Sequence, residues 1–186
     1  MKRKFPIHNR LVFYSIIFFL LYVLILLSAF TSQHKSVEKE SSPVGIDYMM
    51  LYTAGETALA GNAKDIYDVP AQQAIIEDML GTEMPKDVQW FYPPTLLLVI
   101  VSIFSVLPFY LSLILWLACT LAMSVFSLYI LMPKYKNLAF LCLGFPAVMY
   151  NFRWGQNSFL STSLLGLGIA FMKSNPVLSG LMFGLM

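Results

Sequence analysis

Acidic residues are absent from the second half of the chain. All ten Asp and Glu residues of the 186-residue sequence lie between Glu38 and Asp87, and the four charges that follow Phe91 are all basic. Charged residues make up 12% of the chain, whereas they form about a quarter of a soluble domain. A soluble domain would spread its acids over the whole surface, so this distribution indicates that the two parts of the chain face different solvents.

Several motifs of soluble enzyme chemistry are also missing. The sequence has no Gly-rich phosphate loop, no HExxH pair and no nucleophile elbow. Its two cysteines, Cys119 and Cys142, both lie in apolar runs and read as core or lipid-facing residues rather than as a disulfide or metal pair. The net charge of +2 is too small to indicate nucleic acid binding. We therefore expect no metal, no cofactor and no nucleic acid partner.

The first apolar segment is long enough to span a membrane. Residues 11–30 form an uncharged run of twenty, the length needed to cross a hydrocarbon core of about 30 Å. The positive-inside rule keeps the basic tail, residues 1–10, in the cytoplasm. A cleaved signal peptide is the alternative, but its apolar region would be only about 7–15 residues long. An uncleaved span is favoured, and it places residues 31–92 outside the cytoplasm.

The outer segment, residues 31–92, is hydrophilic and is predicted to carry two short helices. The first follows Asp47 and ends at Gly61, and the second spans residues 71–80. Tyrosines and leucines fall along one face of the first helix, which suits a helix that lies on the membrane surface. The aromatic residues that close this segment, residues 90–92, are typical of an interfacial belt.

The remaining part, residues 93–186, is predicted to contain further transmembrane or re-entrant helices. Residues 109–132 are long enough to cross, whereas residues 95–107 and the later apolar segments are short. Short segments indicate partial or tilted helices around a water-filled cavity, because irregular backbone at membrane depth must be shielded from lipid. The fold class is therefore an all-α polytopic membrane protein.

The orientation of these later segments has two solutions. If residues 95–107 cross the membrane, Lys134 lies outside, against the positive-inside rule. If they only re-enter, Lys134 lies inside and the turn at Gln156 lies outside, and this second solution is favoured. The apolar run that ends at Met186 is too short to complete a span, so we expect the chain to be the N-terminal part of a longer protein.

Two charged residues are the main candidates for chemistry. Asp47 is interpreted either as an N-cap of the following helix or as a carboxylate at the outer membrane surface that accepts a proton from a hydroxyl. Arg153 lies between two apolar segments and is interpreted either as a snorkelling residue or as a phosphate clamp. The residues that are predicted to contact substrate are Arg153 and five further polar or aromatic side chains: Tyr48, Tyr52, Tyr92, Gln156 and Asn157.

A set of short segments resembles the polyprenol-phosphate-mannose-dependent transferases of glycosyltransferase family 87, which are multi-spanning enzymes of the GT-C class. After a basic tail and a first span, the matching pieces follow in the family's order: residues 45–55, 58–61, 66–68, 91–98 and 107–109, Trp116, Pro146, Asn151 and residues 155–157. The resemblance implies a GT-C-like transmembrane bundle in which the aspartate of the first outer loop is the general base. That role falls on Asp47.

The resemblance also implies the reaction and its location. We expect a hexosyl- or mannosyltransferase that moves a sugar, with inversion, from a polyprenyl-phosphate donor to an acceptor glycan or glycolipid. The expected location is the plasma (inner) membrane of a bacterium, with the active side extracytoplasmic and membrane lipid as a further partner. The alternative is a small membrane protein or an inactive remnant whose outer loop binds a partner. A transporter is less favoured, since no paired repeat is present.

Overall fold

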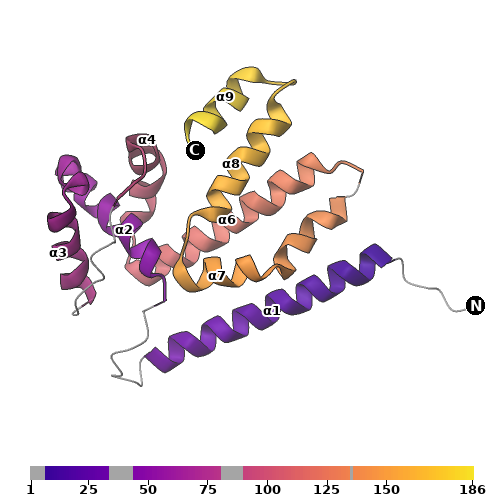
Figure 1. Ribbon diagram of the computed structural model, residues 1–186, viewed down its shortest axis with the longest axis horizontal. Helices are drawn as coiled ribbons and strands as arrows, with labels where there is room; N and C mark the ends of the chain where they lie inside the picture. The colour runs from indigo at the N-terminus through magenta and orange to yellow at the C-terminus, as the bar shows by residue number, and fades with distance from the viewer. Residues whose placement is uncertain (1–6, 34–43, 81–89, 135) are drawn as a thin grey trace, which may run out of the picture.

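The structure is a computed structural model that describes residues 7–33, 44–80, 90–134 and 136–186. These residues form helices, and no strand occurs among them. Figure 1 shows the long helices α1 and α6 on either side of the shorter helix α7, and a group of short helices gathered at one end. The predicted all-helical architecture is confirmed.

Two helices are long and apolar enough to cross a membrane. Helix α1 spans Ile7–Gln33 and α6 spans Phe109–Leu131, and their membrane segments are Asn9–Ser28 and Phe109–Leu131. Only 11% of the first segment and 33% of the second are buried inside the protein. Most of this apolar surface therefore faces outwards, and an apolar surface of that extent requires hydrocarbon as its solvent. The chain is a helical membrane protein.

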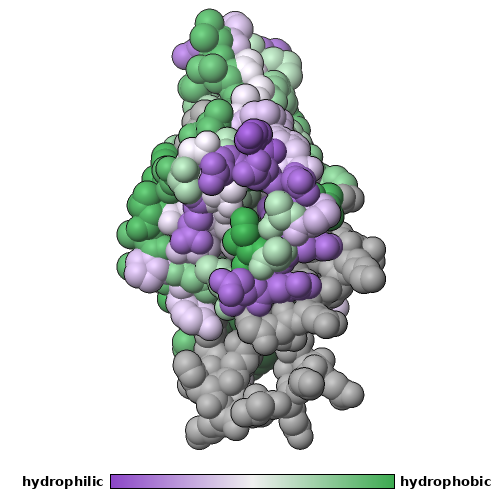
Figure 2. Space-filling model, turned by 90° about the vertical axis from the view of Figure 1, so that its left-hand side faces the viewer, coloured by the Kyte–Doolittle hydropathy of each residue, from purple (hydrophilic) through white to green (hydrophobic). Residues whose placement is uncertain are grey.

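The described part of the hydrophilic segment that follows α1 folds into a unit of short helices, the polar unit. It contains α2, Ile46–Leu59; η1, Ala63–Tyr67; and α3, Val69–Leu80. The Asp68 carboxylate caps α3 by accepting the backbone N–H of Ala71 at 3.3 Å. Figure 2 looks at this end of the molecule and shows hydrophilic side chains gathered around a small apolar area at its centre, with further apolar side chains at the left and the top. Both predicted loop helices are therefore present, within two residues of their predicted starts.

The segment before α6 packs against this polar unit. It consists of α4, Pro94–Leu96; the π-helical turn η2, Leu97–Val101; and α5, Ser102–Ser105. Helix α2 packs on η2 and α5, and a Cβ on Gly55 would lie 2.0 Å from the Ser105 hydroxyl. Helix α6 consequently starts at the polar unit and ends at the same end of the molecule as the start of α1 (Figure 1). This packing is compatible with the re-entrant solution, and the side of the membrane on which each end lies stays a prediction.

The chain then returns along α1 and folds back on α6. The 3₁₀ helix η3, Lys136–Gly144, and α7, Pro146–Trp154, lie against α1, where the Tyr22 hydroxyl donates to the Gly144 carbonyl at 3.1 Å. Helix α8, Ser158–Phe171, packs along α6 and carries α9, Pro176–Gly184. A Cβ on Gly166 would lie 2.8 Å from the Ser127 hydroxyl, so the small residue is what permits this close packing of α6 and α8.

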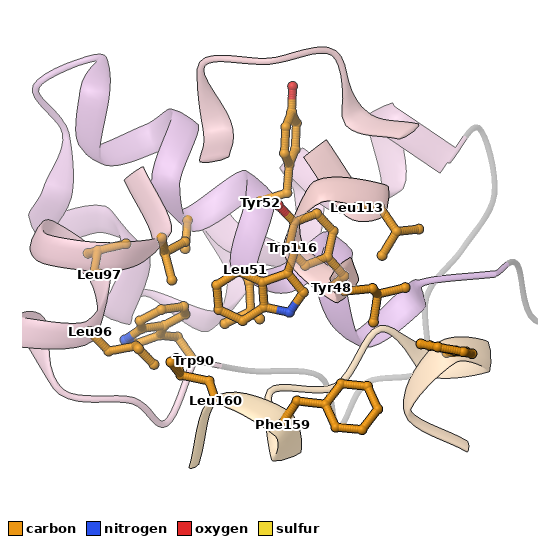
Figure 3. Packing of buried hydrophobic residues seen from close by; sticks show 14 of the residues in the cluster. Tyr48, Leu51, Tyr52, Trp90, Leu96, Leu97, Leu113, Trp116, Phe159 and Leu160 are labelled. Carbon is orange, nitrogen blue, oxygen red and sulfur yellow. The ribbon is translucent and has the colours of Figure 1, made fainter. Parts of the chain in front are cut away.

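The core joins the polar unit to α6. Its largest fully buried members are Trp116 and Tyr48, whose ring lies 5.6 Å from the Trp116 ring. Figure 3 shows these side chains packed among leucines of α2, η2 and α6. The aromatic face of α2 was expected at the membrane surface, and that prediction is wrong. The aromatic side chains of α2 pack on Phe109 and Trp116 of α6 instead, because burial against apolar protein removes them from water as well as contact with lipid would.

Candidate active site

Asp47 lies in the first turn of α2. The helix begins at Ile46, and its N-cap is Gly45 with φ 80°. No side chain caps this helix, so the interpretation of Asp47 as the N-cap is wrong. The left-handed conformation of Gly45 moves the helix start ahead of Asp47 and leaves its carboxylate available to other partners. A negative charge in the first turn also interacts favourably with the helix dipole.

The partner of Asp47 comes from the other end of the sequence. Gln156, in the turn between α7 and α8, donates its Nε2–H to Asp47 Oδ2 at 3.0 Å. The Ser158 hydroxyl in turn donates to Gln156 Oε1 at 3.4 Å. The side chains of Asp47 and Gln156 are both half-buried. Two of the predicted site residues, 109 positions apart, are therefore in direct contact.

Backbone contacts hold this turn against α2. The Gly45 N–H donates to the Arg153 carbonyl at 3.0 Å. Gly155 ends α7 with φ 71°, and a Cβ added to it would lie 2.5 Å from the Tyr48 Cβ. Only a glycine fits both the left-handed backbone and the close approach. The turn that carries Gln156 is thus docked on the helix that carries Asp47.

Tyr92 lies on the border of the site. Burial and the nearby Asp47 carboxylate both raise the pKa of Tyr92, so its phenol stays neutral and can donate a hydrogen bond. Its ring contacts Trp90 edge-on at 5.2 Å, and its carbonyl accepts the Tyr67 hydroxyl at 3.3 Å. Tyr92, at the end of the hydrophilic segment, is therefore close enough to Asp47 for the carboxylate charge to act on its phenol.

Two tyrosines that were predicted to bind substrate belong to the core instead. Tyr48 and Tyr52 are 1% and 5% exposed. The Tyr48 hydroxyl shares a 2.5 Å hydrogen bond with Ser112, and the Tyr52 hydroxyl donates to the Leu107 carbonyl at 2.9 Å. Burial raises the pKa of Tyr48 to about 12. Both hydroxyls are engaged inside the protein, so these residues fix α2 in place.

Tyr48→Phe is expected to lower the free energy of unfolding by about 1 kcal/mol, the usual net value of one hydrogen bond. Ser112 keeps its bond to the Phe104 carbonyl at 2.7 Å, so no buried hydroxyl is left without a partner. Thermal unfolding in detergent measures this loss of stability. The enzymatic activity of the variant should be unchanged. A functional loss without a loss of stability would return Tyr48 to the substrate site.

Three further polar residues surround the turn. Arg153 is half-buried in the last turn of α7, with its guanidinium 5.5 Å from the Trp154 ring. Asn157 is the N-cap of α8 and is half-buried, but its side chain makes no capping bond. Asn151 is 4% exposed, and its Oδ1 has no hydrogen-bond partner among the described residues. Sequence reasoning missed Ser158, because a serine at a helix start indicates only capping.

Metal ligands do not gather in the part of the chain that the structure describes. No three His, Cys, Asp or Glu side chains there form a group that could hold an ion. The functional groups of the site are a carboxylate, two amides, a neutral phenol and a guanidinium, and they lie at the polar end of the helical bundle. Such groups can accept a proton from a hydroxyl and bind polar or anionic ligands.

The fold and the site together describe a helical membrane protein with a polar site around the carboxylate of Asp47, next to the apolar helices. Residues 90–186 match the family described as Glycosyltransferase family 87, and this range is more than half of the chain. The chain belongs to this family, as its resemblance predicted, and is a glycosyltransferase by that membership. The match includes Tyr92, Arg153 and Gln156, while Asp47 lies before it. No curated protein and no solved structure matches the chain.

Proposed function

We propose that this glycosyltransferase moves a hexose, with mannose as the first candidate, from a polyprenyl-phosphate donor to a glycan or glycolipid outside the cytoplasm. The observation that carries the proposal is the contact between Asp47 and Gln156, which joins the polar outer unit to the region that matches the family. It supports a single centre built from both parts, with the carboxylate at its middle.

In the proposed reaction Asp47 is the general base. An acceptor hydroxyl gives its proton to the carboxylate while its oxygen forms a bond to the anomeric carbon of the donor sugar. The bond between that carbon and the phosphate oxygen breaks, and polyprenyl phosphate leaves with the electron pair. Attack opposite the leaving group inverts the anomeric centre. Arg153 supports this chemistry, since a guanidinium near the turn suits the charge of the departing phosphate.

A lipid-linked donor is supported by a groove between the membrane helices. The groove measures about 750 Å³ and is lined almost wholly by apolar atoms of α1, α6, η3 and α7. One of its lining residues, Phe152, packs edge-on against Phe19 of α1 at 5.8 Å and directly precedes Arg153. A hydrocarbon chain in this groove would carry its phosphate towards the guanidinium and towards Asp47.

The outer location is supported by the positions of the basic residues. Helix α1 follows the basic tail, and Lys134 follows the end of α6, at the end of the molecule opposite the polar unit (Figure 1). The positive-inside rule assigns that end to the cytoplasm. Asp47 would then face the side on which nucleotide sugars are not available, which suits a lipid-phosphate donor.

The test is a donor comparison in proteoliposomes that contain the protein expressed from its intact natural gene. A polyprenyl-phosphate sugar and the nucleotide-activated form of the same labelled sugar are each supplied with an extract of envelope glycolipids. Transfer is expected from the lipid-linked donor alone. Transfer from the nucleotide sugar alone would contradict the proposal.

A further inference from the structure

We propose that Gln156 is a positioning residue that fixes the orientation of the Asp47 carboxylate, and that Ser158 fixes Gln156 in turn. This inference rests on the proposed role of Asp47 as the base. It differs from the sequence prediction, in which Gln156 binds substrate directly. The two roles can be separated because a positioning residue acts on the reaction step, whereas a ligand-binding residue acts on affinity.

Both ends of the Gln156 amide are engaged within the protein. The Nε2–H group donates to Asp47 Oδ2 at 3.0 Å, and Oε1 accepts the Ser158 hydroxyl at 3.4 Å. Since an ionised carboxylate can only accept, Asp47 requires the Nε2 end of the amide, and Oε1 is left to accept the Ser158 hydroxyl. The Ser158 hydroxyl therefore holds the far end of the amide while its Nε2–H donates to the carboxylate.

The bond from Gln156 gives the two carboxylate oxygens different roles. Oδ2 accepts the amide N–H, and we assign the proton of the acceptor hydroxyl to Oδ1. A carboxylate held at one oxygen also loses the freedom to rotate about its terminal torsion, which is otherwise broad. Holding the proton-accepting atom in its reactive position is a recognised source of catalytic rate.

The support of Gln156 is rigid enough for this role. Gln156 directly follows Gly155, whose left-handed backbone lies against Tyr48. The Arg153 carbonyl accepts the N–H of Gly45, two residues before Asp47, at 3.0 Å. The base and its partner are therefore fixed by backbone contacts on both sides, as a preorganised site requires.

Gln156→Met tests the inference, since methionine is similar in length but cannot donate. In the proteoliposome assay, kcat should fall about 10- to 100-fold, the usual effect of misplacing a reactive group, while KM for the lipid-linked donor changes less than about twofold. In an Asp47→Asn background the same substitution should cause no further loss, because the base that Gln156 positions is already removed. A raised KM with unchanged kcat would overturn the inference and make Gln156 a substrate ligand.

The serine provides a second, milder test. Ser158→Ala should lower kcat in the same direction, and Ser158→Thr, which keeps the hydroxyl, should restore it. Ser161→Ala on the same helix is the matched control and should have no effect. Equal rates for Ser158→Ala and Ser158→Thr would overturn the role of the hydroxyl. If the Asp47→Asn variant retains sugar transfer, the proposed function fails. If Asp47→Asn loses transfer while Gln156→Met keeps its normal kcat, only the positioning role of Gln156 is rejected.

Discussion

Replacing Asp47 with asparagine is expected to lower the rate of sugar transfer by about 10²- to 10⁴-fold, the usual contribution of a general base. Asparagine has the same shape and still offers an oxygen to the Gln156 amide, so the turn stays docked on α2. It cannot take up the proton of an acceptor hydroxyl. The measurement is the initial rate of transfer from a labelled polyprenyl-phosphate sugar, with the amount of protein in the membrane determined in parallel.

Glu56→Gln is the matched control for this experiment. Glu56 lies on the same helix as Asp47 and is exposed. The substitution removes the same charge from the same polar unit, so any general electrostatic effect appears in both variants. Transfer should be close to normal. Equal losses in the two variants, or a normal rate in Asp47→Asn, would remove Asp47 from the mechanism.

Gly155→Ala is expected to destabilise the protein by about 2–5 kcal/mol. The left-handed conformation costs a residue with a side chain about 1–2 kcal/mol, and forcing a new atom into a packed region costs about 1–3 kcal/mol more. The new Cβ would lie 2.5 Å from the Cβ of Tyr48 and 3.2 Å from the Gly45 Cα. The turn must move away from α2, so the hydrogen bond between Asp47 and Gln156 should also be weakened.

Gly61→Ala separates the two causes. Gly61 has φ 86°, and a Cβ there would meet nothing within 4 Å, so the substitution costs only the backbone term of about 1–2 kcal/mol. Thermal unfolding of both variants in detergent gives the comparison, and transfer should be lost only with Gly155→Ala. Equal loss of stability in the two variants would show that the turn is not packed on α2 as described.

The helices could be predicted from local patterns, because their determinants are local. An uncharged run of twenty residues and a second run of similar length correspond to α1 and α6. Gly61 follows the end of α2 in the left-handed conformation, which is the behaviour expected of a glycine at a helix end. The short length of residues 95–107 likewise predicted a partial helix, and this segment forms the short elements α4, η2 and α5.

The site was predicted only in part, because its contacts join distant residues. The sequence indicated Asp47 and Gln156 separately, but nothing in their spacing shows that they touch. The N-cap assignment of Asp47 failed because the conformation of Gly45 depends on its contact with the turn after α7. The burial of Tyr48 was missed for a related reason, since an aromatic stripe suits a lipid surface and a protein surface equally well.

The groove between α1 and α6 has a kinetic consequence for a lipid-linked donor. The groove is lined by α1 and α6 together with η3 and α7. If the donor is lipid-linked, as we propose, it would travel within the bilayer and reach the groove from the side. The encounter would then be a two-dimensional search, and the turnover of the enzyme would follow the number of donor molecules per area of membrane rather than their concentration in water.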